Sequence, residues 1–155
     1  MAESADNPGV IAPPPLIYAA AFLIALLLHR LALMTIFGGG LALWPGLALV
    51  ALSVGLAIWG RQALVSAGTN VNPYRPSTAI VDSGPYRFTR NPLYVALTLM
   101  YVGLTLAFDT WWGFILLVPV LIIMHRGVIR REERYLEGKF GESYRGYRAR
   151  VRRYL

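Results

Sequence analysis

The sequence contains no cysteine, only two histidines and few charged residues. Without cysteine there are no disulfides, thiolate metal ligands or cysteine nucleophiles. The histidines, His29 and His125, lie far apart in the chain, which disfavours a histidine-based metal site, so we expect no metal. Charged residues make up 15% of the chain, against about 25% in soluble domains. The low charge excludes a soluble globular protein.

The chain is rich in apolar residues, with 56% hydrophobic residues and a mean hydropathy of +0.50. Four apolar runs occur, at about 16–37, 41–64, 93–108 and 111–124. About 20 helical residues cross the roughly 30 Å of bilayer hydrocarbon. These runs predict an all-α, polytopic membrane protein with about four transmembrane helices, followed by an amphipathic cytoplasmic helix at the C-terminus.

A single membrane domain is expected over residues 1–155. Its predicted parts are an N-terminal tail at 1–15, a first helical hairpin with a very short turn at 16–64, a loop at 65–91, a second hairpin at 92–125 and a C-terminal cytoplasmic helical segment at 126–155. Gly, Asn, Pro and Ser residues mark 65–91 as a loop. Asp109 is expected to cap the fourth helix.

The net charge of +7 is concentrated in residues 126–155, which hold ten Lys and Arg against four Glu. Because this tail follows an apolar span, we expect it to contact anionic membrane lipid rather than nucleic acid. Basic residues in cytoplasmic loops orient membrane proteins. The basic central loop and tail therefore predict that both termini are cytoplasmic, with the turns at 38–40 and 109–110 outside.

Two polar clusters stand at the ends of apolar runs. Residues 84–94 place two arginines, an Asn-Pro pair and two tyrosines at the start of one run, and residues 130–133 follow the end of another. Burying such groups beside lipid costs several kcal/mol unless each has a partner. Asn91 and Pro92 also suit the start of a helix, as N-cap and first-turn residue. Two such clusters at one membrane boundary predict a single polar site.

The sequence has no Gly-rich dinucleotide fingerprint, zinc-protease motif or nucleophile elbow. The composition therefore favours chemistry by positioning, such as group transfer from an activated soluble donor to an apolar acceptor.

The order G-P-Y-R-x-x-R-N-P-x-Y, then E-E, then F-G-x-x-Y-x-x-Y resembles the isoprenylcysteine carboxyl methyltransferase and phospholipid methyltransferase superfamily. The matching residues are 84–94, Glu132–Glu133 and 140–147, within roughly residues 66 to 155. The resemblance implies an integral membrane methyltransferase that uses S-adenosyl-L-methionine. Because the extra spans of eukaryotic members are missing, the expected location is a prokaryotic inner (cell) membrane. The donor would lie between the 65–91 loop and the C-terminal segment, and a lipid or other hydrophobic acceptor would enter from the bilayer.

The resemblance also implies which residues form the site. By position, the cofactor-binding residues would be Thr78, Ala79, Ile80, Val81, Tyr86, Asn91, Pro92, Leu93, Tyr94 and Glu132. We also expect His125 to belong to the cofactor site, and Arg90 and Glu133 to be the catalytic residues. Many relatives have His at the positions of Thr78 and Asn91, so no imidazole base is expected there. Glu132 or Glu133 would pair with the donor ammonium, and Arg90 with its carboxylate.

Simpler interpretations of these residues stay open. Arg87 and Arg90 suit headgroup anchors, Glu132 and Glu133 suit a solvated helix, and His125 suits an interfacial residue. Two other functions also remain. One is a membrane reductase with a nicotinamide cofactor, and the other is a non-enzymatic protein that binds anionic lipid.

Overall fold

The computed structural model describes residues 7–72 and 74–154, and its regular elements in this part of the chain are all helical. Residues 1–6 of the predicted tail lie outside the described residues. The elements are α1 (Pro14–Leu31), α2 (Leu43–Ser66), the 3₁₀ turn η1 (Gly84–Arg87), α3 (Pro92–Ala107), α4 (Trp111–Ile123), the π-helical turn η2 (Met124–Ile129), α5 (Arg130–Phe140) and α6 (Glu142–Arg150). The all-α prediction is confirmed.

Within residues 7–72 and 74–154, three helices are long and apolar enough to cross a membrane. They are α1, α2 and the continuous 30-residue helix formed by α4, η2 and α5. The apolar helix α3 has 16 residues and is about 24 Å long, shorter than the roughly 30 Å of hydrocarbon. Four apolar helices are thus present as predicted, one of them short. The protein is an integral membrane protein by these features.

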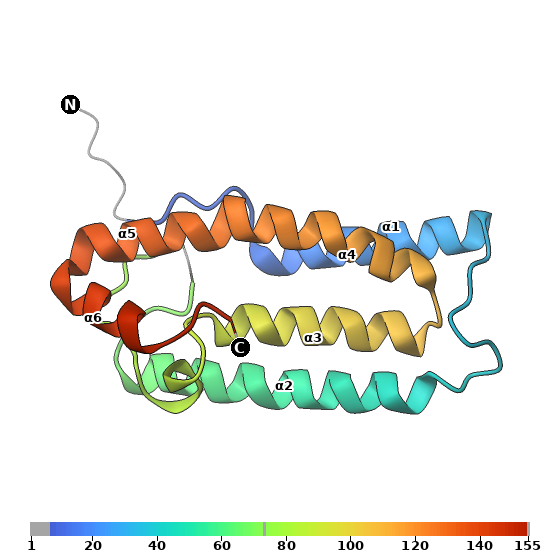
Figure 1. The fold of residues 1–155 in the computed structure, drawn as a ribbon, viewed down its shortest axis with the longest axis horizontal. Coiled ribbons are helices and arrows are strands. Elements are labelled where there is room, and N and C mark those ends of the chain that lie inside the picture. The colour runs from blue at the N-terminus through green and yellow to red at the C-terminus, as the bar shows by residue number, and fades with distance from the viewer. Residues whose placement is uncertain (1–6, 73, 155) are drawn as a thin grey trace.

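The helices run side by side, with α2 on one side of α3 and with α1 and α4 on the other (Figure 1). α2 packs along α3, whereas α1 packs mainly against α4 and also contacts α3. The expected first hairpin differs from this arrangement, because the principal partner of α1 is α4 and not α2. Residues 32–42 form a long connection between α1 and α2, in place of the very short turn.

Asp109 explains why α1 ends at Leu31, although apolar sequence continues to residue 37. Its carboxylate accepts the N–H groups of residues 36, 37 and 38 at 3.0, 3.0 and 2.8 Å. These hydrogen bonds lower the pKa of Asp109, and the bond from the Phe37 N–H has the largest effect. The Trp112 indole also donates to the Ala32 carbonyl at 2.8 Å. Asp109 was expected to cap α4, but residue 110 occupies the N-cap position and Asp109 holds the connection instead.

α2 and α3 approach closely because small residues line their contact. The buried residues of α2 are Gly46, Ser53 and Gly60, spaced seven apart and therefore on one face. A Cβ atom added at Gly103 of α3 would lie 2.8 Å from the Gly46 carbonyl oxygen and 2.9 Å from the Val50 nitrogen. Side chains larger than hydrogen would force the helices apart. At the other end of the same face, a Cβ atom added at Gly60 would lie 2.9 Å from Cδ2 of Leu93, so the end of α2 also approaches the start of α3 closely.

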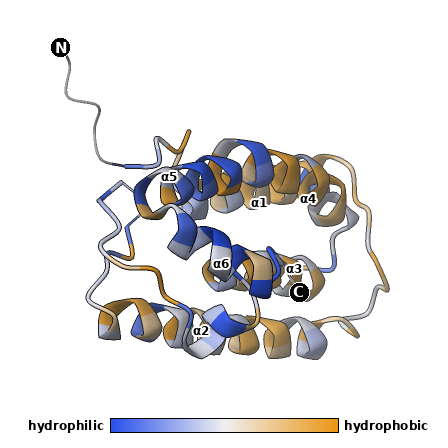
Figure 2. Cartoon of the chain, turned by 60° about the vertical axis from the view of Figure 1, so that its left-hand side comes forward, coloured by the Kyte–Doolittle hydropathy of each residue, from blue (hydrophilic) through white to orange (hydrophobic). Residues whose placement is uncertain are grey.

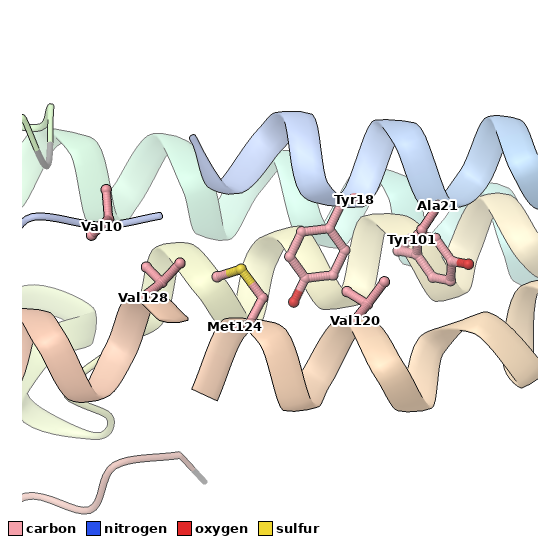
Figure 3. Packing of buried hydrophobic residues seen from close by; sticks show 7 residues of the cluster. All are labelled: Val10, Tyr18, Ala21, Tyr101, Val120, Met124 and Val128. Carbon is pink, nitrogen blue, oxygen red and sulfur yellow. The ribbon is translucent and has the colours of Figure 1, made fainter. Parts of the chain in front are cut away.

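A cluster of buried side chains joins α1, α3 and α4. Figure 3 shows its members, which come from the N-terminal segment, these three helices and η2: Val10, Tyr18, Ala21, Tyr101, Val120, Met124 and Val128. The Ile11 N–H donates to the carbonyl of Gly127 in η2 at 3.3 Å. π-Helical turns shift the register of a helix and frequently occur near functional sites. Here η2 directly precedes the acidic pair of α5.

The two ends of the bundle differ in polarity. Hydrophilic residues gather around α5, α6 and the neighbouring loops, while α1, α3 and α4 are largely apolar away from this end (Figure 2). Of the fifteen Lys and Arg, all except Arg30 belong to this polar end, where α1 begins, α2 ends and α3 begins. The two predicted polar clusters therefore lie at the same end of the bundle.

Candidate active site

A cavity of about 320 Å³ lies at the polar end, between the loop after α2, the start of α3, and α5 and α6. Ten of the thirteen predicted site residues line it: Ala79, Ile80, Val81, Tyr86, Arg90, Asn91, Leu93, Tyr94, Glu132 and Glu133. The volume is within the range of about 300–1,000 Å³ that is usual for small-molecule sites. The structure thus brings residues from two distant parts of the sequence to one cavity.

Three predicted site residues do not line the cavity. The Thr78 hydroxyl donates to the Gly68 carbonyl at 2.8 Å, so it closes the loop on itself. Pro92 is fully buried in the first turn of α3. His125 lies in η2, where its Nδ1 is 2.8 Å from the Tyr154 hydroxyl. These three residues support the walls of the site from outside.

Asn91 stands at the N-cap position of α3, but its side chain does not cap the helix. Its Nδ2 instead donates to the Arg153 carbonyl at 3.0 Å, so the C-terminal residues meet the start of α3. The next residue is proline and has no N–H, so the first free N–H of the helix belongs to Leu93, which lines the cavity. Helix N-termini favour anions because their N–H groups are unpaired.

The two neighbouring glutamates of α5 have different surroundings. Glu132 is half-buried in the cavity wall, and its Oε2 accepts the Tyr94 hydroxyl at 2.8 Å. Within the described residues Glu132 has no ion pair. Glu133 is buried between two guanidinium groups, 3.2 Å from Arg90 and 2.7 Å from Arg153. Glu132 is therefore available to a cationic ligand, while the charge of Glu133 is already compensated.

Arg90 has hydrogen-bonding capacity to spare. Its side chain is 8% exposed, and its Nη1 lies 3.2 Å from Glu133 without hydrogen-bond alignment. Its Nε is buried and has no hydrogen-bond partner among the described residues. Buried donors without a partner are costly, so an unpaired N–H beside a cavity indicates a place for an anionic group of a ligand.

Three tyrosines close the cavity from the side of η1 and α6. Burial raises the pKa of Tyr144 to about 12 and also raises the pKa values of Tyr86 and Tyr147. The Tyr147 hydroxyl donates to the Tyr86 carbonyl at 2.8 Å. All three remain protonated near neutral pH, so they act here as neutral walls and hydrogen-bond donors.

Other residues of the site were not predicted from the sequence. The further lining residues come from the N-terminal segment, α1, α2, the loop, α3, α5 and α6: Pro8, Pro14, Pro15, Ala57, Leu64, Thr69, Asn70, Val71, Asn72, Ser77, Leu97, Leu136, Tyr144 and Tyr147. Tyr144 and Tyr147 belong to the motif F-G-x-x-Y-x-x-Y, which pointed to their region. Nothing distinguishes Arg153 from the other arginines of the basic tail, so no sequence pattern identified its pairing with Glu133.

Comparisons with known proteins identify the family to which the chain is similar. The family model described as phospholipid methyltransferase matches residues 41–143, about two thirds of the chain. An uncharacterized protein of Haemophilus influenzae is 35% identical over 63 residues, which are 41% of this chain and all of that protein. The cobalt-zinc-cadmium resistance protein CzcN of Cupriavidus metallidurans is 36% identical over 98 residues, 62% of this chain and 43% of CzcN. No solved structure matches the chain significantly.

Proposed function

The chain belongs to the phospholipid methyltransferase family, and on this premise we propose that it transfers a methyl group from S-adenosyl-L-methionine to a lipid or other hydrophobic acceptor. The observation that carries the proposal is the cavity that joins the start of α3 to α5. Among the described residues, the Glu132 carboxylate in its wall has no ion pair and the buried Nε–H of Arg90 has no hydrogen-bond partner. These are complementary to the ammonium and carboxylate of a methionine group.

Each charged part of the donor has a complementary group in the cavity wall. Glu132 would pair with the ammonium, while Arg90 and the N–H of Leu93 at the start of α3 would hold the carboxylate. Ile80, Val81 and other apolar residues of the loop would cover the adenine ring. The chemistry that the donor supplies when bound is a methyl group activated on a positively charged sulfonium.

The protein contributes mainly by positioning and by excluding water. Holding the reacting atoms at about 3–3.5 Å in the correct orientation makes the bimolecular transfer effectively unimolecular. Removing water from the site strengthens the electrostatic interactions within it. Glu133 was predicted to be catalytic, but its two ion pairs favour a different role. We propose that it fixes Arg90 in the cavity wall.

An apolar path supports a hydrophobic acceptor. Part of the cavity wall is formed by Pro14 and Pro15 at the start of α1 and by Ala57 and Leu64 of α2. The principal partner of α1 is α4 and that of α2 is α3, so these two helices do not pack mainly against each other. We propose that the acceptor enters between α1 and α2. Its reacting atom would be an oxygen, nitrogen or sulfur.

The distribution of charge supports a cytoplasmic site. Fourteen of the fifteen Lys and Arg belong to the end of the bundle that holds the cavity. Basic residues are retained on the cytoplasmic side of membranes. We propose that the site and both ends of the chain face the cytoplasm, in a prokaryotic cell membrane.

Calorimetry in detergent tests this function directly. We expect the protein to bind S-adenosyl-L-methionine, and we expect Asn91→Ala and Glu132→Gln each to weaken that binding by at least ~1.5 kcal/mol, the scale of a charged hydrogen bond. Glu142→Gln is the matched control, because the Glu142 side chain is 86% exposed and outside the cavity. Mass spectrometry of lipids incubated with isotopically labelled donor would then identify the acceptor.

Two results would contradict the proposal. Binding of a reduced nicotinamide cofactor without binding of the methyl donor would favour a membrane reductase. Binding of anionic lipid, unaffected by Glu132→Ala and with neither cofactor bound, would favour a lipid-binding protein without catalytic activity.

A further inference from the structure

The last described residues of the chain, 151–154, lie beside the start of α3 (Figure 1). We propose that this segment, here called the C-terminal strap, is a positioning element of the donor site and that Arg153 is its central residue. This inference rests on the proposed function, because it assigns the strap a role in binding the methyl donor.

Main-chain contacts fasten the strap to the residues that precede α3. Thr89 and Arg152 form an isolated parallel β-bridge, and the Arg90 N–H donates to the Arg152 carbonyl at 2.9 Å. The Thr89 hydroxyl donates to the Arg153 carbonyl at 3.1 Å. The strap thus contacts each of the three residues before Pro92, two of which line the cavity.

The contact with Asn91 determines which way its amide points. Nδ2 lies 3.0 Å from the Arg153 carbonyl oxygen, a distance at which only a donor is favourable. The reversed amide would set two oxygens against each other. The strap therefore leaves Oδ1 as the free atom of this amide, able to accept a hydrogen bond from a ligand group such as an ammonium or an amine.

The Arg153 side chain makes the second link, across the cavity wall to α5. Its Nε lies 3.0 Å from Oε1 of Glu133 and its Nη2 lies 2.7 Å from Oε2, a two-pronged pair. Arg90 lies on the same carboxylate at 3.2 Å. Arg153 thus shares the charge of Glu133 with Arg90, so that a nitrogen of Arg90 stays free for the ligand.

The third contact of the strap is with His125 in η2. Its Nδ1 is 2.8 Å from the Tyr154 hydroxyl, which ties the end of the strap to η2. The strap therefore joins the start of α3, α5 and η2, the elements that carry both halves of the site. Fastening these elements reduces the conformational entropy that donor binding must otherwise overcome.

The test compares single variants of the full-length protein by calorimetry with S-adenosyl-L-methionine and by thermal unfolding in the same detergent. Arg153→Ala should weaken donor binding about tenfold, a change of about 1.4 kcal/mol, without lowering the unfolding temperature by more than the control does. Arg150→Ala is the control, since it removes an equal charge nearby and its side chain is 70% exposed. Arg153→Lys should recover part of the loss, because lysine keeps the charge without the two-pronged geometry.

A double-mutant cycle then separates positioning from general stability. In a Glu133→Gln background, Arg153→Ala should weaken donor binding by no more than about twofold, because the partner charge is already absent. Equal donor affinity in Arg153→Ala and Arg150→Ala would overturn the strap proposal and leave the proposed function intact. Failure of the unaltered protein to bind the donor would overturn the proposed function, and the strap's role in donor binding with it.

Discussion

The role of a polar side chain in this protein depends on whether its hydrogen bonds are satisfied. Tyr94 and Tyr101 lie seven residues apart on α3, two turns along the same face. The Tyr94 hydroxyl donates to Glu132, whereas the Tyr101 hydroxyl is buried without a partner among the described residues. The Tyr101 ring packs edge-on against Tyr18 and Phe22. The ring of Tyr101 therefore matters to packing, while the hydroxyl of Tyr94 matters to the site.

Tyr94→Phe should weaken binding of the methyl donor about three- to tenfold, measured by calorimetry, because Glu132 loses the donor that fixes its carboxylate. Tyr101→Phe is the matched control on the same helix. It should leave donor affinity unchanged and the unfolding temperature unchanged or higher, since it removes an unsatisfied buried hydroxyl. Equal donor affinity in the two variants would show that the Tyr94 hydroxyl has no part in the site.

At the scale of helices, sequence patterns predicted which elements form better than where they end. The four apolar runs each contain a helix, and helix continues past His125 as expected. The end of α1 was missed, because Asp109 holds the following chain through bonds that span some seventy residues. Local periodicity contains no information on such a contact.

The same reason divides the candidate site into predictable and unpredictable parts. The clusters at 84–94 and 130–133 were recognisable because polar groups beside long apolar runs are costly without a purpose. The contributions of the strap and of Asn70 were not, since a basic tail and a polar loop look alike whether or not they fold over a cavity. Only the three-dimensional structure shows that Arg153, unlike the other arginines of the tail, pairs with Glu133.

The contact between α2 and α3 is tested by adding one methyl group. Gly103→Ala should lower the free energy of unfolding by about 1–3 kcal/mol, because the new Cβ would meet the backbone of α2 at Gly46 and Val50. Gly55→Ala on α2 is the control, because a Cβ there has nothing within 4 Å. That variant should be neutral or stabilising by up to about 1 kcal/mol, from helix propensity alone. Thermal and denaturant unfolding in detergent would measure both, and similar effects at the two positions would contradict the close packing.

At the scale of the whole molecule, the polar end of the bundle is also the end that holds the candidate site. One end of the bundle carries nearly all the basic residues, the acidic pair and the cavity, while the other carries the 32–42 connection and the turn at Asp109 (Figures 1 and 2). The proposed donor is soluble and charged and would reach the polar end from water, and the proposed apolar acceptor would reach it from lipid. A site at the boundary between the two phases meets both requirements without a long channel through the protein.

The absence of cysteine allows the orientation of this end to be measured with single introduced thiols. Thr35 is exposed in the 32–42 connection, and Glu142 is exposed at the start of α6. In intact bacterial cells expressing the protein, a membrane-impermeant maleimide should label Thr35→Cys, whereas Glu142→Cys should be labelled only after the cells are permeabilised. The expectation follows from the basic residues around α6, which membrane insertion retains in the cytoplasm. The unaltered protein, which has no thiol, is the blank. Labelling of Glu142→Cys but not of Thr35→Cys in intact cells would place the cavity outside, where cells do not keep S-adenosyl-L-methionine, and would contradict a cytoplasmic site.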